Sequence, residues 1–422
     1  MNSAVKSLDN SSVIVIGAGI VGVSSAIHLQ RRGAKVTIID RLPPGDGTSF
    51  GNAGVLAACS MVPVPVPGLL TKAPKMLLDP DGPLFLKWAY LPRLLPFLAP
   101  YLMNGRATRV RKIAEALSHI VVDAVDEHQT LSRDTGADKW LTGDDYMFLY
   151  RNRAAYEADP FTWELRRQNW PHGWDEIESA DLREMAPQIN PEYTFAARFG
   201  QHGLCTSPGS YTKALAKHFV SEGGQVIAGE VTALAAPENG PVTVTVSGET
   251  YTASRIVVAA GVYSSEVAKL VGAAFPLEAE RGYHIELKDP THNVPIPTMV
   301  ADGKFVASPQ AGGLRVAGLV EFGGTEAGPS KGPIKLLRRR IADVLPGLEY
   351  QSHTEWLGYR PATPDSLPVI GAKAGQPNVF YAFGHHHIGL TGAPKTGRLL
   401  AAMMSGEMPN IDMAPYSPDR FD

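Results

Sequence analysis

The chain has only two cysteines in 422 residues, Cys59 and Cys205. They stand far apart and outside any CxxC or other metal-ligand spacing, so neither a disulfide framework nor a zinc site is indicated. Basic charge is also scarce, because 39 Lys and Arg oppose 42 Asp and Glu and leave a formal charge of -3. Without a basic excess to neutralise phosphates, nucleic acid is not expected as a partner.

An uninterrupted apolar run long enough to span a membrane is missing too. The first ten residues, MNSAVKSLDN, are polar and lack the apolar region of a signal peptide, so a cytoplasmic location is expected. The longest apolar stretch, residues 83–103, is interrupted by Lys87, Arg93 and three internal prolines. We expect a lid or helical segment packed on the core. The alternative is peripheral contact with the inner face of a membrane, helped by Trp88 and Tyr90.

The most informative stretch is SSVIVIGAGIVGVSSAIHLQRRGAKVTIIDR, near the N-terminus. It predicts a buried strand, the pattern Gly17-x-Gly19-x-x-Gly22, a helix closed by Gly33, and a second strand ending on Asp40. The first glycine permits a tight turn, the second lets a pyrophosphate approach the backbone, and the third lets helix and strand pack closely. Asp40 can accept hydrogen bonds from ribose hydroxyls and disfavours the 2'-phosphate of NADP. Both NAD and FAD use this pattern.

Two further segments favour FAD. The stretch RLPPGDGTSFGNAGVL follows Asp40 directly, where a simple NAD domain would enter another helix. Its glycines and short polar side chains let the backbone approach a large planar ligand, although an ordinary surface loop is the alternative. Much later, the strand Arg255–Val258 ends on Ala259-Ala260-Gly261 and resembles the second half of the same domain. The length predicts two domains, one of them discontinuous in sequence.

Five motifs carry a family resemblance over essentially the whole chain: VIVIGAGIVGVSSAIHL, TSFGNAG, RGYHIEL, GYRPATPDSLPVIG and GHHHIGLTGAPKTGRLL. The chain resembles the glycine oxidase and D-amino-acid oxidase/dehydrogenase superfamily of FAD-dependent oxidoreductases. Within it, the chain is most similar to small-subunit type D-amino-acid dehydrogenases, including ones acting on D-hydroxyproline. The resemblance implies an α/β fold with a Rossmann-like FAD-binding domain (1–57, 197–272 and 353–422). It also implies a substrate domain (58–196 and 273–352), built on an antiparallel sheet with helices.

The resemblance also implies which residues contact the flavin. The ADP half would be held by Gly17, Ala18, Gly19, Ile20, Gly22, Asp40 and Arg41, with Val231 near the adenine. The side from the phosphates to the isoalloxazine would be lined by Ser49, Asn52, Ala53, Gly54, Val55, Ala260 and Gly261. Some relatives tether the flavin through a cysteine near the C-terminus or a histidine in the N-terminal loop. This chain has neither at the corresponding places, so non-covalent FAD is expected.

The run of three histidines near the C-terminus does not predict a metal site, because adjacent side chains in a glycine-flanked loop rarely converge on one ion. A helix is expected after Leu390, with Thr391 as its N-cap. In the resembled fold this helix faces the pyrimidine edge of the flavin. Gly389, Leu390 and Thr391 would then stabilise the negative charge that develops there. His386 and His387 are candidates for contact with substrate or water near flavin N5, a structural role being the alternative.

An amino-acid carboxylate is best bound by the planar fork of an arginine. Arg360, in GYRPATPD, is the first candidate, with pairing to Asp365 or Glu355 as the alternative. The strand ERGYHIEL alternates in side-chain direction, and Arg281 and Tyr283 fall on one face. By resemblance this face is expected to look toward flavin and substrate, which makes Arg281 the second candidate. The spacing does not choose between the two arginines.

The implied reaction is oxidative deamination of a D-amino acid, with D-proline or cis-4-hydroxy-D-proline as candidate substrates. The α-hydrogen would pass as hydride to flavin N5, giving an imino acid, and a quinone or dioxygen would then accept the electrons. Alternatives on the same scaffold are oxidation of glycine, of an N-methyl amino acid such as sarcosine, or of a 2-hydroxy acid. An NAD-dependent dehydrogenase and a flavin-binding subunit without turnover of its own are further alternatives.

Overall fold

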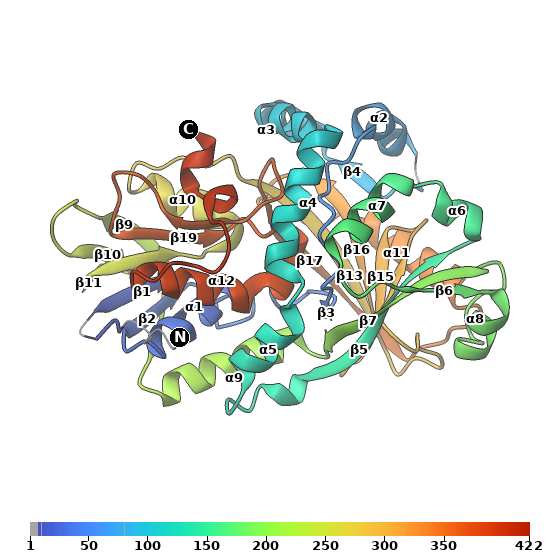
Figure 1. The fold of residues 1–422 in the computed structure, drawn as a ribbon, viewed down its shortest axis with the longest axis horizontal. Helices are drawn as coiled ribbons and strands as arrows, with labels where there is room; N and C mark the ends of the chain where they lie inside the picture. Colours follow the sequence, from blue (N-terminus) through green and yellow to red (C-terminus); the bar gives the residue numbers. More distant parts are fainter. Residues whose placement is uncertain (1–6, 10, 80) are drawn as a thin grey trace.

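The computed structural model describes residues 7–9, 11–79 and 81–422, and Figure 1 shows two sheets surrounded by helices. Residues 1–6, on which the prediction of a polar N-terminus partly rests, lie outside this description. Among the described residues, no helix combines the length and apolar character needed to cross a membrane.

The first sheet has six strands in the order β18-β19-β12-β1-β2-β8, all parallel except the pair β18 and β19. Their bounds are β1 (Ser12–Ile16), β2 (Lys35–Asp40), β8 (Gln225–Ala228), β12 (Arg255–Val258), β18 (Val369–Ala372) and β19 (Val379–Phe383). Short β-branched runs such as SVIVI suit a parallel sheet covered on both faces. Three separate stretches of chain contribute strands, so the predicted discontinuous Rossmann-like architecture is confirmed.

Both faces of this sheet are covered. Helices on one side are α1 (Ile20–Gln30), α9 (Pro208–Ser221) and α12 (Gly389–Met404), and on the other are α10 (Ser264–Lys269) and a meander of β9 (Val231–Ala235), β10 (Val242–Val246) and β11 (Glu249–Ala253). In Figure 1, α12 runs beside α1. The two helices cross at Gly397, where a Cβ would lie only 2.8 Å from the backbone of Ser24.

The second sheet has ten strands, of which eight follow the order β17-β13-β16-β15-β14-β5-β7-β3, while β4 pairs with β16 and β6 with β7. Most pairs are antiparallel, as expected for the sheet of the substrate domain. The bounds are β3 (Val55–Leu56), β4 (Leu84–Leu86), β5 (Leu141–Tyr150), β6 (Asp175–Glu178), β7 (Phe195–Cys205), β13 (Glu278–Lys288), β14 (Thr298–Val300), β15 (Phe305–Gln310), β16 (Gly313–Phe322) and β17 (Ser352–Ala362).

The remaining helices surround this sheet. They are α2 (Leu69–Leu78), α3 (Leu91–Asn104), α4 (Ala107–Val121), α5 (Ala124–Ser132), α6 (Arg153–Glu157), α7 (Pro160–Asn169), α8 (Ser179–Met185) and α11 (Lys331–Val344). Helix α11 packs an apolar stripe against one face of the sheet through residues such as Leu337 and Ile341. The other face is left to meet the nucleotide-binding half.

The predicted domain boundaries differ from the strand pairing at three places. Residues 55–56, 197–205 and 353–362 were expected in the FAD-binding domain, but they belong to β3, β7 and β17 of the ten-stranded sheet. The physical reason is that β7 and β17 pair along their whole length with β5 and β13, so a cut at residue 197 or 353 would fall inside a strand. How the chain divides into domains beyond this pairing stays a prediction.

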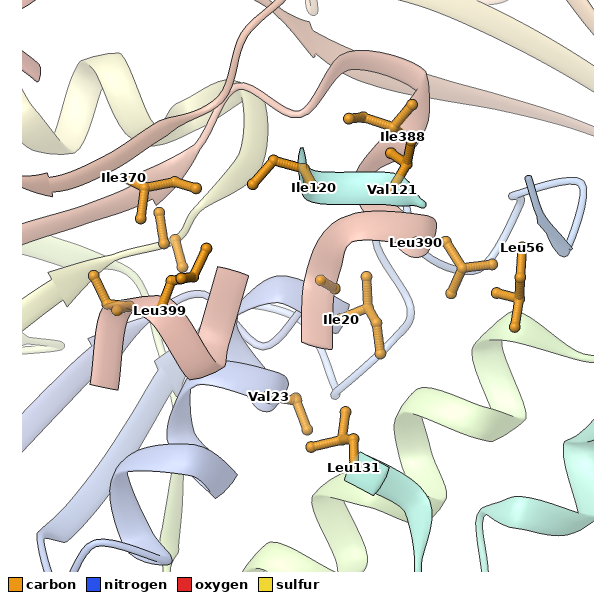
Figure 2. Packing of buried hydrophobic residues seen from close by; sticks show 14 of the residues in the cluster. Ile20, Val23, Leu56, Ile120, Val121, Leu131, Ile370, Ile388, Leu390 and Leu399 are labelled. Atoms are coloured by element: carbon orange, nitrogen blue, oxygen red, sulfur yellow. The ribbon is translucent and has the colours of Figure 1, made fainter. Parts of the chain in front are cut away.

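One apolar core joins the two halves. Figure 2 shows Ile20 and Val23 of α1 close to Leu131 of α5, and Leu390 of α12 facing Leu56. All of these side chains are buried. Burial from several elements holds the first turn of α12 in a fixed place between the sheets.

Candidate functional site

A cavity of about 1010 Å³ runs between the two sheets, from the β1–α1 turn to the inner face of the ten-stranded sheet. It collects most of the residues predicted from sequence. Those that line it are Gly17, Gly19, Ile20, Asp40, Arg41, Ser49, Asn52, Ala53, Val55, Val231, Ala260, Gly261, Tyr283, Arg360, His386, His387, Gly389, Leu390 and Thr391. The predicted residues that do not line it are Ala18, Gly22, Gly54 and Arg281.

The β1–α1 turn has the geometry that the glycine pattern predicts. A Cβ on Gly17, whose φ is +117°, would lie 2.3 Å from the carbonyl oxygen of Ala259, and one on Gly22 would lie 1.9 Å from the carbonyl oxygen of Gly17. Neither position accepts a larger residue. Gly22 and Ala18 therefore shape the turn from behind the cavity, while the α1 N-terminus faces into it.

Asp40 and Ser49 complete the turn. The Asp40 carboxylate accepts hydrogen bonds from the backbone N–H of Ala18 at 2.6 Å and of Leu42 at 2.9 Å. The Ser49 hydroxyl accepts one from the N–H of Ile20 at 2.9 Å. Next to them, the Arg41 guanidinium lies over the ring of Tyr263, 3.9 Å from its centre. These polar groups line the end of the cavity where ribose and phosphates are expected.

The loop after Asp40 is held by the ten-stranded sheet. The carbonyl oxygen of Ala53 accepts hydrogen bonds from Ser308 Oγ at 2.7 Å and Gln310 Nε2 at 3.1 Å. Arg315 Nη1 donates to the carbonyl oxygen of Asn52 at 2.7 Å. Gly54 has φ +81° and no room for a Cβ against Cys205. The second part of the loop is therefore anchored inside the molecule, whereas its first part, including Leu42 and Phe50, is exposed.

Helix α12 begins at Gly389, two residues earlier than predicted, and Ile388 rather than Thr391 is its N-cap. The reason is that a short 3-10 turn leads straight into the helix, so no side chain caps it. Leu390 is buried against the core of Figure 2, and its carbonyl oxygen accepts a hydrogen bond from His128 at 2.9 Å. The first backbone N–H groups of α12 are left without helical partners at the cavity wall.

The three histidines have three different environments. His385 is buried and lies 2.9 Å from the Thr396 hydroxyl, and burial lowers its pKa to about 3. His386 is also buried, whereas His387 exposes its surface to the cavity while the surrounding protein lowers its pKa to about 3. Across the described residues, no group of three or more His, Cys, Asp or Glu side chains is arranged to hold a metal ion.

Arg360 extends from β17 over the neighbouring strand β13. Its Nη1 donates to Glu280 Oε1 at 2.7 Å and to the carbonyl oxygen of Leu319 at 3.0 Å. Its predicted alternative partners were wrong, since Asp365 pairs with Arg420 and Glu355 lies near His353. Among the described residues, nothing accepts a hydrogen bond from Nε or Nη2 of Arg360, which lines the cavity. One edge of the guanidinium is thus available to a ligand.

Arg281 cannot anchor a substrate in this structure. Its side chain is 0% exposed and is paired with Glu321 at 2.6 Å. Its other N–H groups donate to the carbonyl oxygens of Gly324, Ala327 and Gly328. No donor remains for a ligand, so the expectation that this residue faces the substrate was wrong.

Tyr283 shares that environment. Its hydroxyl donates to Glu321 at 2.6 Å and accepts from the N–H of Ser330 at 3.0 Å, so its polar end points away from the cavity although part of the ring lines it. The prediction for this face is thus wrong for Arg281, whereas the ring of Tyr283 lines the cavity as expected. Glu280 and Gly282, from the other face of β13, line the cavity as well.

Glu280 was missed by the sequence reasoning. It lines the cavity, lies 2.7 Å from His386 Nε2 through Oε2, and is 2% exposed. Burial alone would raise its pKa, but His386 and Arg360 lower that pKa to about 2. The signal in the sequence is a glutamate at an inward position of an otherwise enclosed strand, where a charged residue needs a partner.

Comparison with known proteins agrees with this geometry. The sequence profile of a family described as DAO, FAD dependent oxidoreductase, matches residues 12–403. The chain belongs to this family. It is 38% identical to a D-amino-acid oxidase of Bradyrhizobium diazoefficiens, over 97% of this chain and 98% of the relative. It is 30% identical to a D-amino acid dehydrogenase of Methylobacterium sp., over 97% and 99%.

Solved structures show the same fold. A glycine oxidase from Geobacillus kaustophilus superposes with a TM-score of 0.71 at 21% identity, covering 97% of this chain and 98% of its own. An L-proline dehydrogenase from P. horikoshii gives 0.73 at 18% identity, covering 98% of both chains. The family match and the two relatives in turn make the chain an FAD-dependent oxidoreductase, and the NAD-dependent alternative is set aside.

The cavity fits FAD. It is continuous from the glycine turn of α1, past the loop at Ser49 to Val55, to the N-terminus of α12. Neither cysteine lines it, and burial raises the pKa of Cys59 and of Cys205 to about 12. Both observations agree with the expectation that FAD is held without a covalent bond to cysteine.

Proposed function

We propose that this DAO protein catalyses the FAD-dependent oxidative deamination of a D-amino acid. The observation that carries the proposal is the free Nε and Nη2 edge of Arg360 in the same cavity as the α12 N-terminus. The names of the D-amino-acid oxidase and dehydrogenase relatives support this choice of substrate class.

Each residue group has a distinct part in this function. Arg360 would bind the substrate carboxylate through two N–H groups, which fixes the α-carbon in orientation. Gly389, Leu390 and Thr391 present backbone N–H groups and the positive end of α12 to negative charge that develops beside them. Bound FAD supplies the acceptor of the α-hydrogen as hydride, and the substrate leaves as an imino acid.

His386 and His387 stay candidates for contact with the substrate. His387 is the more accessible of the two from the cavity, and its lowered pKa of about 3 keeps it neutral at physiological pH. A neutral imidazole offers one donor and one acceptor to the substrate amine or a water. No general base is required if the amine itself is neutral when it reacts.

Within the D-amino acids, D-proline is our first choice and cis-4-hydroxy-D-proline the second. The walls near Arg360 are apolar and come from α3 and β16, including Leu98, Val320 and Phe322. Such walls favour a compact apolar side chain over a charged one. A ring that carries its amine inside it would also lose little conformational entropy on binding.

The test is anaerobic mixing of the yellow holoenzyme with a substrate panel while the flavin absorbance is followed. The panel contains D-proline, cis-4-hydroxy-D-proline, D-alanine, their L-enantiomers, sarcosine, glycine and a 2-hydroxy acid. Bleaching by D-amino acids ahead of the others supports the proposal. Preference for L-enantiomers, sarcosine or a hydroxy acid contradicts it, and no bleaching by any compound points to a flavin-binding subunit without turnover.

The electron acceptor is proposed to be a quinone or dioxygen, with the segment 83–103 as a peripheral membrane contact. Trp88, Leu95 and Met103 are exposed on this segment, whereas Leu94 and Tyr101 are buried beneath them. Since α3 also covers the cavity, contact here would bring a lipid-dissolved acceptor close to the site.

Flotation with anionic phospholipid vesicles tests the contact. The triple variant Trp88→Ser, Leu95→Ser, Met103→Ser should stay with the lipid-free fraction while wild type floats. Met408→Ser is the control, because Met408 is an apolar residue outside this segment and is even more exposed than the three substituted residues. Equal behaviour of the wild type and the triple variant would remove the membrane from the proposal and favour dioxygen.

A further inference from the structure

Glu280 lies between two residues of the candidate site, Arg360 and His386. Its Oε1 accepts from Arg360 Nη1 at 2.7 Å, and its Oε2 lies 2.7 Å from His386 Nε2. The second contact is close, but neither of its two atoms has a hydrogen-bond partner in the part of the chain that the structure describes. Oε1 is therefore the oxygen through which Glu280 holds Arg360, and Oε2 lies beside the His386 ring.

The backbone around this carboxylate is unusual at two non-glycine residues. Leu319 has φ +60° and His386 has φ +53°, both in the left-handed region that such residues rarely adopt. Leu319 directs its carbonyl oxygen to Arg360 Nη1 at 3.0 Å, and His386 brings its ring to Glu280. Both strained positions thus contact the same cluster, and the surrounding fold must hold them there.

Arg360 packs on a glycine of the neighbouring strand. The guanidinium lies directly over Gly282 of β13, where a Cβ would be 2.5 Å from Nη2. Nη1 is bound to Glu280, and Gly282 lies under the plane of the guanidinium. The edge that faces the cavity could therefore change only if the guanidinium rotated away from Glu280. An arginine held in this way loses little entropy when it binds a carboxylate.

We propose that Glu280 is the positioning residue of the substrate-carboxylate site, holding Arg360 with its Nε–Nη2 edge toward the ligand and His386 beside it. The inference rests on the proposed function, because it takes Arg360 as the carboxylate anchor. Glu280 acts through Arg360, whose Nη1 it holds with Oε1.

The experiment uses the holoenzyme and two ligands of the same shape, pyrrole-2-carboxylate and pyrrole-2-carboxamide. Their dissociation constants are measured by calorimetry and by the change in the flavin spectrum. In Glu280→Gln the carboxylate is expected to bind about tenfold more weakly, since the guanidinium is free to turn, while the carboxamide is unaffected. A purely structural role of Glu280 would weaken both ligands together.

Glu278→Gln is the matched control. Glu278 is on the same strand and the same face as Glu280, is also buried, and accepts a hydrogen bond from Tyr90 at 2.9 Å instead of contacting Arg360 or His386. Its substitution makes the same chemical change two residues away. We expect wild-type binding of both ligands.

The outcomes separate this inference from the proposed function. If Arg360→Met also leaves carboxylate binding unchanged, the anchor itself is wrong and the proposed function loses its main support. If Arg360→Met weakens the carboxylate but Glu280→Gln does not, only the positioning role fails. Should Glu280→Gln not fold, Glu280→Asp keeps the buried charge but withdraws it from Arg360. It must then show the same selective loss, and equal binding of the carboxylate would refute the role.

Discussion

Arg281 and Arg360 are two arginines on paired strands, and each is bound to a buried glutamate. Arg281 has no exposed surface, and every N–H group of its guanidinium has an acceptor within the protein. Arg360 is bound through Nη1 alone, and its side chain is 22% exposed at the cavity. The two arginines differ in the number of N–H groups that have no acceptor among the described residues of the protein. An arginine whose N–H groups are all bonded stabilises the fold, whereas one with N–H groups left over can bind a ligand.

Their glutamates differ in the same sense. Glu321 receives Arg281 and the Tyr283 hydroxyl in a cluster closed off from the cavity. Glu280 accepts a hydrogen bond from Arg360 and lies 2.7 Å from His386, and both of these residues line the cavity. The pair of Arg281 and Glu321 is desolvated completely when the protein folds. The pair of Arg360 and Glu280 still has N–H groups of Arg360 that can bind a ligand.

Substitution of Arg281 should have the largest effect on stability. In Arg281→Met, the Glu321 carboxylate and three carbonyl oxygens lose their donor, and leaving a buried charge without its partner costs about 3–5 kcal/mol. Urea unfolding of the holoenzyme measures this loss. Arg153→Met, which removes an exposed arginine also paired with glutamates, is the control and should change the midpoint little. Comparable losses in both variants would contradict the structural role of Arg281.

Substitution of Arg360 should act on catalysis instead. Arg360→Met is expected to raise KM for the amino acid about 100-fold, equivalent to about 2.7 kcal/mol, because a bidentate charged contact is lost. The FAD content should stay near one per chain, since no predicted flavin contact involves this residue. Steady-state kinetics with D-proline and the visible spectrum check both points. An unchanged KM would transfer the anchor role elsewhere.

The contrast between the two arginines also shows which features of the site can be predicted from the sequence. The turn around Gly17, Gly22 and Asp40 has the geometry that the spacing predicts, because fixed spacing reports backbone geometry directly. The contacts of these residues with FAD stay a prediction. The anchor question depended on which face of β13 looks inward. Alternation defines two faces but does not name the inner one, and a register shift between Arg281 and Tyr283 lies at this point.

Other residues were out of reach for the same reason. The partners of Glu280 lie on β17 and on the histidine turn, which are separated from β13 by many residues in the sequence. The role of Glu280 could therefore be recognised only in the folded structure. The hydrogen bonds from Ser308 and Arg315 to the carbonyl oxygens of Ala53 and Asn52 are likewise contacts between segments distant in the sequence. Local patterns predict strands and turns, but they carry no information on which side chains tertiary packing makes neighbours.

A pH series can sharpen the comparison through Glu280 and Glu278 of β13. The folded-state pKa of Glu280, about 2, is below its ordinary value of 4.5, so its carboxylate stabilises the fold fully above pH 4.5 and loses this contribution as the pH falls toward 2. The stability difference between wild type and Glu280→Gln should therefore shrink by about 1.4 kcal/mol per pH unit below pH 4.5.

Glu278 should give the opposite trend in the same measurement. Burial raises its pKa, so its contribution is fully present below pH 4.5 and is lost as the pH rises through the folded-state value. Thermal unfolding of wild type and both glutamine variants between pH 6 and 3.5 compares the two directly. Parallel curves for the two variants would show that the cavity-facing glutamate has no special pairing.

Tyr283 provides the smallest and most discriminating test, because its ring lines the cavity while its hydroxyl belongs to the Arg281 cluster. Tyr283→Phe removes the bonds to Glu321 and to the N–H of Ser330 and should cost about 1 kcal/mol of stability. If the hydroxyl has no part at the substrate, KM and the rate of flavin reduction stay at wild-type values. A raised KM with unchanged stability would place Tyr283 with Arg360 instead, and the division of β13 into a sealed face and a binding face would have to be redrawn.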